Sequence, residues 1–183
     1  MKQALLISAF ALALSALNPC FAGEPVNPNE PVKKLPPEER KRRFEALKKE
    51  LEAFRPAQDA ERDEVLVYLQ QVITASSKFA RENPGTAEGF EAASSGARQL
   101  AERSHPKSGE LAQLALDVAP PAGVEQRQVA ICWLLVANGC IVKGDFAAAR
   151  TALDKMKDIS PELHALALKQ LEEHEAKTKD GKK

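Results

Sequence analysis

The sequence predicts an all-α protein made of antiparallel helical hairpins, with about seven helices after a leader segment. Three observations favour this fold class. Apolar residues make up 44% of the chain but aromatic residues only 5%, so Ala, Leu and Val must fill the interior, as in close helix packing. Apolar residues recur at spacings of three and four, which is the helical period. Clusters of Pro, Gly and Asn separate these stretches and predict tight turns.

Residues 1–22 have the pattern of a secretory signal peptide. A positively charged start precedes an apolar run over residues 4–17. Cys20 and Ala22 are small residues that lie three and one positions before a cut at Gly23. The run is shorter than the ~20 apolar residues of a membrane-spanning helix, so cleavage is expected rather than anchoring. Asn18-Pro19 before Cys20 disfavours a lipid anchor on that cysteine. We therefore expect an exported bacterial protein, periplasmic or secreted, with no stable membrane insertion after cleavage.

A proline-rich tether and a charged helix are expected next. Residues 23–37 combine prolines with polar residues and have no apolar face to bury, which predicts a disordered tether. A helix is expected over residues 38–54, with acidic residues interleaved among Arg40-Lys41-Arg42-Arg43. That interleaving indicates a solvated face rather than a nucleic-acid site. A narrow apolar seam on this helix is expected to dock against the next helix, and it consists of Phe44, Leu47, Leu51 and Phe54.

Three further helices are expected over residues 59–81, 86–104 and 108–119. Asp59, which starts the first, and Thr86 and Ser108 are placed to cap the amino ends, because their side-chain oxygens can accept from free backbone N–H groups. The clearest break in the chain follows at residues 120–123. The expected inward residues are Val65, Leu66, Leu69, Val72, Ile73, Ser76 and Phe79, then Phe90, Ala93, Ala97, Leu100 and Ala101, then Leu111, Leu114, Ala115 and Val118.

The helix expected over residues 125–142 is the most apolar stretch after the leader. It has no polar side in its middle, which indicates burial between other helices. Cys132 and Cys140 lie eight residues apart on it. That spacing separates their Cα atoms by ~12 Å, beyond the reach of a disulfide, so buried free thiols are expected. The alternative is a bend at Asn138-Gly139 that lets the two cysteines pair.

Two helices and a short tail are expected at the carboxyl end. Gly144-Asp145 supplies a turn and a cap for a helix over residues 146–158. Ser160-Pro161 starts a capping helix over residues 161–177, which leaves 178–183 as a disordered tail. The expected inward residues are Phe146, Ala149, Leu153 and Met156, then Leu163, Leu166, Ala167 and Leu171.

Residues 130–163 resemble one tetratricopeptide repeat (TPR), a two-helix unit of about 34 residues. Trp, Leu, Gly and Tyr of the repeat correspond to Trp133, Val136, Ala137 and Cys140, and Ala149, Leu153 and Pro161 follow at the repeat's spacing. The resemblance implies a TPR-like short α-solenoid over residues 38–177, with a hairpin at 125–163. The residues that it assigns to packing of the repeat are Trp133, Ala137, Cys140, Gly144, Phe146, Ala149, Leu153 and Pro161.

The same resemblance implies a binding surface. TPR proteins hold peptides or partner helices in a groove lined by the first helix of each pair. One variety grips a terminal carboxylate with Lys and Asn on this helix; Asn138 fits, but Leu134 stands where the Lys would be needed. An apolar ligand, or stacking of the next helix, is therefore expected at the groove. Its candidate residues are Ile131, Leu134, Asn138, Ile141 and Val142.

No pattern in the sequence marks a catalytic, metal-binding or cofactor-binding site. His105, His164 and His174 fall in different elements without ligand spacing. Basic and acidic residues both number 26, so no bulk charge favours nucleic acid. We therefore expect a non-catalytic protein–protein interaction or scaffolding module of the bacterial cell envelope, with a protein or peptide as its partner. The sequence does not indicate an oligomeric state. The alternatives are a structural or regulatory accessory subunit of an envelope assembly, and an enzyme with an unmarked carboxylate or histidine site.

Overall fold

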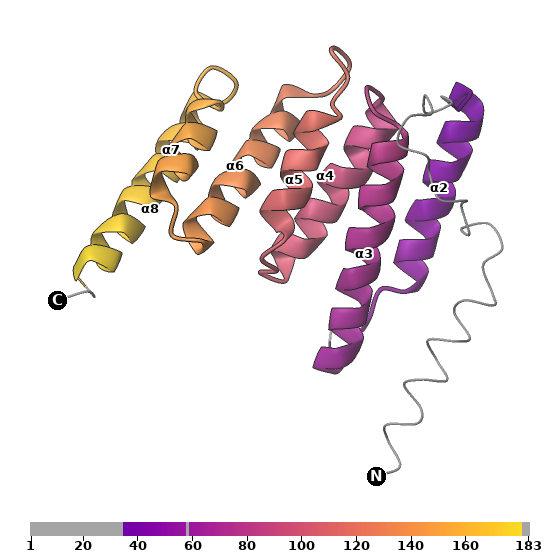
Figure 1. The fold of residues 1–183 in the computed structure, drawn as a ribbon, viewed down its shortest axis with the longest axis horizontal. Helices are drawn as coiled ribbons and strands as arrows, with labels where there is room; N and C mark the ends of the chain where they lie inside the picture. Colours follow the sequence, from indigo (N-terminus) through magenta and orange to yellow (C-terminus); the bar gives the residue numbers. More distant parts are fainter. Residues whose placement is uncertain (1–34, 58, 181–183) are drawn as a thin grey trace, which may run out of the picture. The chain divides into compact units, whose positions relative to one another are not determined.

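The computed structural model describes residues 35–57 and 59–180, and within these ranges the chain forms seven α-helices and no strand. The all-α prediction is therefore confirmed for this part of the protein. The predicted signal peptide and most of the predicted tether lie outside the described residues. The helices are α2 (Pro37–Ala53), α3 (Arg62–Glu82), α4 (Ala87–Glu102), α5 (Ser108–Asp117), α6 (Gln126–Val142), α7 (Phe146–Asp154) and α8 (Pro161–Asp180), as labelled in Figure 1.

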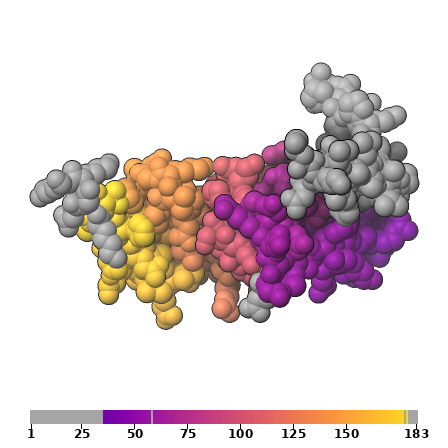
Figure 2. All heavy atoms as spheres, turned by 90° about the horizontal axis from the view of Figure 1, so that it is seen from below, coloured from indigo at the N-terminus to yellow at the C-terminus, as the bar shows by residue number. Residues whose placement is uncertain are grey.

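Within the unit from residue 34 to residue 183, successive helices run in opposite directions and follow one another in chain order (Figure 1). The substantial contacts among the described helices all join helices one or two positions apart in the chain. Thus α2 contacts α4 and α4 contacts α6 in one row, while α3 contacts α5 in a second row. The space-filling view in Figure 2 shows the same succession, from the indigo end of α2 to the yellow α8. This nearest-neighbour packing is the arrangement of helical-repeat arrays.

Two apolar cores meet at α6. The first core is built by α2 to α5 and receives Cys132 and Leu135 from α6. The second is built by α7 and α8 and receives Ala130 and Ala137 from α6. The prediction that this helix is buried between other elements is therefore confirmed, with Val136 packed against both cores.

Helices α5 and α6 cross in backbone contact. A Cβ placed on Gly109 would lie 3.0 Å from the carbonyl oxygen of Leu135 and 3.1 Å from Cα of Gly139. Only glycine leaves room for two helix backbones at this separation. Helix α6 runs without interruption through Asn138-Gly139, and both Cys132 and Cys140 are free. The expected free thiols are thus present, although Cys140 is only half-buried.

Two of the predicted amino-terminal caps are confirmed and two are wrong. Thr86 accepts a hydrogen bond from the backbone N–H of Gly89 at 3.1 Å, and Asp145 accepts one from Ala148 at 2.9 Å. Asp59 does not cap α3, because that helix begins only at Arg62 after a turn. Ser108 is itself the first residue of α5 and makes no cap. The turn before it is held instead by His105, whose Nδ1 accepts from the backbone N–H of Lys107 at 3.2 Å.

Some predicted ends and faces also differ from the structure. Helix α7 ends at Asp154 rather than at residue 158, and Met156 is buried in the turn that follows. Helix α8 continues to Asp180, into the stretch that was expected to be disordered. Leu66 and Leu166, which were expected to point inward, are 46% and 56% exposed, and Tyr68 takes the buried position on α3. None of the described helices combines the length and apolarity that crossing a bilayer requires.

Candidate functional site

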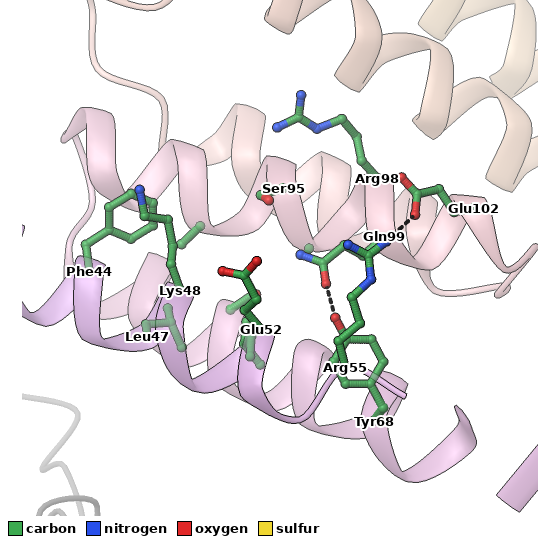
Figure 3. A pocket seen from close by; sticks show the side chains of 14 residues that line it. Phe44, Leu47, Lys48, Glu52, Arg55, Tyr68, Ser95, Arg98, Gln99 and Glu102 are labelled. Atoms are coloured by element: carbon green, nitrogen blue, oxygen red, sulfur yellow. Dashed lines mark hydrogen bonds and ion pairs between the residues drawn. The ribbon is translucent and has the colours of Figure 1, made fainter. Parts of the chain in front are cut away.

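A cleft of about 390 Å³ opens between α2 and α4, with α3 at its base (Figure 3). Its size lies at the lower end of the range for ligand pockets, roughly 300–1,000 Å³. It is lined by Phe44, Leu47, Lys48, Leu51, Glu52 and Arg55 of α2 and the turn after it, Tyr68 and Ser76 of α3, and Ala92, Ser95, Gly96, Arg98, Gln99 and Glu102 of α4.

The apolar seam of α2 supplies one wall of this cleft. Phe44, Leu47 and Leu51 are buried, as the spacing of the seam predicted. The ring of Phe44 packs against Phe79 of α3 with 5.6 Å between centroids. The fourth seam residue, Phe54, is 49% exposed because α2 ends one residue before it. The docking of this seam against its neighbours places the polar residues of α2 opposite those of α4.

An ion pair joins the amino-terminal halves of the two walls. Nε of Arg40 lies 2.8 Å from Oε2 of Glu88, and both side chains are about four-fifths buried, at 18% and 21% exposed. Burial by itself raises the pKa of Glu88, but the backbone hydrogen bond at the start of α4 and the Arg40 guanidinium outweigh it, so the pKa is lowered. This pair ties α2 directly to α4 beside the cleft.

A buried hydrogen bond orders the opposite end. The Tyr68 hydroxyl donates to Oε1 of Gln99 at 2.6 Å (Figure 3). Burial raises the pKa of Tyr68, with smaller and opposing effects of Arg55 and Glu102. The hydroxyl therefore stays protonated and remains a donor at neutral pH. Because the Gln99 oxygen is taken by Tyr68, its amide N–H groups are left to face the cleft.

The two cations of the α2 wall are already engaged. Lys48 lies 2.8 Å from the Glu45 carboxylate, and its Nζ sits 4.9 Å from the centre of the Phe44 ring. The bond to Glu45 raises the pKa of Lys48. Arg55 pairs with Glu102 across the cleft at 3.7 Å, with both side chains more than 60% exposed. The pair is drawn as a dashed line in Figure 3.

The side chains of Glu52 and Arg98 make no ion pair or hydrogen bond with any other residue in the described ranges. Figure 3 shows the Glu52 carboxylate in the middle of the cleft, between the Lys48 end and the Arg55 end. Arg98 leaves α4 on the side away from α2. It acts electrostatically on the Cys132 thiol of α6, which places it toward the next helix of the row. The space between α2 and α4 therefore holds one uncompensated carboxylate.

The groove residues predicted on α6 do not line this cleft. Ile131 is half-buried against the first core, whereas Leu134 and Ile141 are half-buried against the second. Asn138 is exposed, and Val142 is 74% exposed. Three of the five candidates, Ile131, Leu134 and Ile141, are thus partly buried in the packing of the helices.

The residues assigned to packing of the repeat behave as one cluster. Trp133, Ala137, Cys140, Phe146, Ala149 and Leu153 all belong to or pack against the second core. Gly144 adopts a φ of 75°, the left-handed conformation that suits glycine, and Pro161 is the exposed first residue of α8. The expected packed helical hairpin is present, and its kinship with tetratricopeptide repeats stays a prediction.

Sequence reasoning missed the cleft itself. The charges of α2 were interpreted as a solvated face, and the helix of residues 86–104 was described only by its small apolar side. A usable signal was present: Ser95, Arg98, Gln99 and Glu102 recur at spacings of three, one and three, which places polar groups on one face. The spacing does not reveal which helix stands opposite that face.

Other chemistry-bearing residues lie apart from the cleft. In the described ranges no three His, Cys, Asp or Glu residues come close enough to hold a metal ion. His164 lies 3.7 Å from Asp154, and its Nε2 is buried without a hydrogen bond. Burial raises the pKa of Cys132 to about 11, so its thiol is uncharged at neutral pH.

Comparison with known proteins adds no relative: no protein-family model, no curated protein and no solved structure matches this chain.

Proposed function

We propose that this chain is an exported, non-catalytic module that binds a segment of a protein partner in the cleft between α2 and α4. The observation that carries the proposal is the composition of the cleft. Its apolar wall of Phe44, Leu47 and Leu51 is bordered by charged groups of both signs and by amide N–H groups of Gln99. The accessible lining is more polar than apolar, so the placed charges and amide groups would select the ligand.

The side chains that line the cleft suit binding better than catalysis. None of the 14 lining residues is a histidine or a cysteine. No hydrogen bond joins the Ser95 or Ser76 hydroxyl to a carboxylate or amine of the lining set, which a hydroxyl nucleophile would need for its activation. Glu102 is engaged by Arg55, and the Tyr68 proton is held by Gln99. The arrangement offers a shaped surface with fixed charges, which is what recognition requires.

Two further features support a polypeptide as the ligand. The cleft lies in the row of α2, α4 and α6, and α6 is the first helix of the hairpin that resembles a tetratricopeptide repeat. In such repeats the first helices line the partner groove. The leader of residues 1–22 supports an exported location for the complex.

Site-specific photocrosslinking in the native cells tests the proposal. A photoreactive amino acid replaces Ser95, inside the cleft, or Thr151, which is exposed on α7. We expect a discrete protein adduct from position 95 and none from position 151. No adduct from either position, or the same adducts from both, would contradict partner binding at the cleft.

A further inference from the structure

We infer that the cleft between α2 and α4 accepts a lysine or arginine side chain of the partner segment, with its cationic head at Glu52. This inference rests on the proposed function and specifies the chemistry of the occupant. It starts from the charges that face the space between the two helices. These are Lys48, Glu52, Arg55 and Glu102, since Arg98 points away from α2 (Figure 3).

The pairing of these charges leaves a net demand for a cation. Lys48 is held at 2.8 Å by Glu45, which lies outside the cleft lining. Arg55 and Glu102 neutralise one another. The Glu52 side chain remains without an ion pair or hydrogen bond among the described residues. Its carboxylate has open acceptor positions for an ammonium or guanidinium group.

The apolar wall matches the rest of a basic side chain. Lysine and arginine carry three or four methylene groups that cover apolar surface while the charged head reaches a polar group. On α2, Phe44 lies about two turns and Leu47 about one and a half turns before Glu52, and Leu51 directly precedes it. These residues are buried against the core, and the small part of each that remains accessible lines the cleft.

Other occupants fit less well. An acidic side chain would place its carboxylate beside Glu52 and Glu102, and both cations would have to leave their present partners. A purely apolar side chain would remove water from Glu52 without replacing it by a partner, which is costly for a charged group. A basic side chain avoids both costs.

Binding of three matched peptides tests the inference. Each is a seven-residue, acetylated and amidated peptide, Ala-Leu-Ala-X-Ala-Leu-Ala, in which X is lysine, glutamate or norleucine. The protein is the chain of residues 23–183, which keeps every described residue. Amide chemical shifts of the Gln99 side chain and of the α2 backbone report occupation of the cleft. We expect the lysine peptide to bind about tenfold more tightly than the glutamate peptide, with an affinity that falls as salt rises.

Two charge-removing substitutions on the same helix localise the effect. Glu52→Gln should weaken binding of the lysine peptide about threefold to tenfold and leave the norleucine peptide unchanged. Glu38→Gln removes the same charge outside the cleft and should change neither. Equal effects of the two substitutions, or equal affinity for lysine and norleucine peptides, would overturn the inference.

The outcomes separate this inference from the proposed function. If the glutamate or norleucine peptide shifts the cleft resonances as strongly as the lysine peptide does, the cleft binds peptides but not through a cation. If no peptide shifts them, the cationic occupant is rejected. If in addition position 95 gives no crosslinked adduct, the proposed function is rejected with it.

Discussion

Replacement of Gly96 by alanine should destabilise the protein, because Ser76 of α3 and Leu111 of α5 leave no room for a Cβ at this residue. A Cβ at position 96 would lie 2.7 Å from Oγ and 3.0 Å from Cβ of Ser76, and 2.8 Å from Cδ2 of Leu111. Leu111 can move its methyl group by rotation. Ser76 is 1% exposed, and its Cβ moves only with the backbone of α3.

The expected magnitude follows from two opposing effects. Overpacking of a filled interior costs about 1–3 kcal/mol, and the upper half of that range applies because a backbone must shift. Alanine is better than glycine inside a helix by about 1 kcal/mol. The net loss in the free energy of unfolding should therefore be about 1–2 kcal/mol. Urea unfolding followed by far-UV circular dichroism measures it as a lower midpoint.

A second substitution tests whether the steric contact is the cause. Ser76→Gly removes both atoms of Ser76 that crowd position 96. On its own it should cost roughly 0.5 kcal/mol through helix propensity. The double variant should be more stable than the sum of the two single effects by about 1 kcal/mol or more. Unchanged or increased stability of Gly96→Ala, or simple additivity in the double variant, would refute the reasoning.

Three further predictions concern an ion pair, the thiols and α6. The lowered pKa of Glu88 contributes stability at pH values above its ordinary pKa of 4.5, and this contribution is lost as the pH falls through the folded-state pKa. Arg40→Met should therefore reduce the loss of stability on the acid side, measured by urea titrations at a series of pH values. In the chain of residues 23–183, a maleimide at pH near 8 should label half-buried Cys140 first and Cys132 only on unfolding, as peptide mass spectrometry will show. Leu134→Glu should lower the free energy of unfolding by about 1–2 kcal/mol, because it places a charge against the second core.

Each of these has a matched control. Lys49→Met removes an exposed charge from α2 and should leave the pH dependence as it is. Guanidinium should abolish the difference between the two thiols, and equal labelling in the native protein would contradict the burial of Cys132. Asn138→Glu, one turn from Leu134 at an exposed position, should change stability by less than about 0.5 kcal/mol. Equal losses for both substitutions would show that the second core does not extend to Leu134.

Local chemistry made much of the fold predictable. The seam of α2 and the caps at Thr86 and Asp145 depend on spacing and side-chain type within a few residues, and both are present. Ser108 is not a cap because α5 begins at Ser108 itself, which puts Lys107 at the N-cap position. Leu66 and Tyr68 exchanged roles because a long helix packed on several neighbours does not keep one straight apolar stripe.

The cleft was not predictable in the same way. Its charges come from two helices about fifty residues apart in sequence, and the ion pair between Arg55 and Glu102 depends on how those helices face each other, whereas the pair between Lys48 and Glu45 lies within α2. The sequence does not show that the Glu52 side chain lacks a partner among the described residues, because that depends on which side chains the fold brings near it. The groove residues of α6 came from the resemblance to a tetratricopeptide repeat, which does not distinguish a half-buried packing position from a free binding surface.

Because α6 contributes to both apolar cores, it determines the order in which the helices unfold. Unfolding of α7 and α8 exposes one face of α6, with Ala130 and Ala137, to solvent, while the other face stays packed against α4 and α5. Fraying from the carboxyl end should therefore slow at α6, whose packing on α5 is more extensive than that of α8 on α7. Once that helix also detaches, the first interior loses Cys132 and Leu135 and opens to solvent as well.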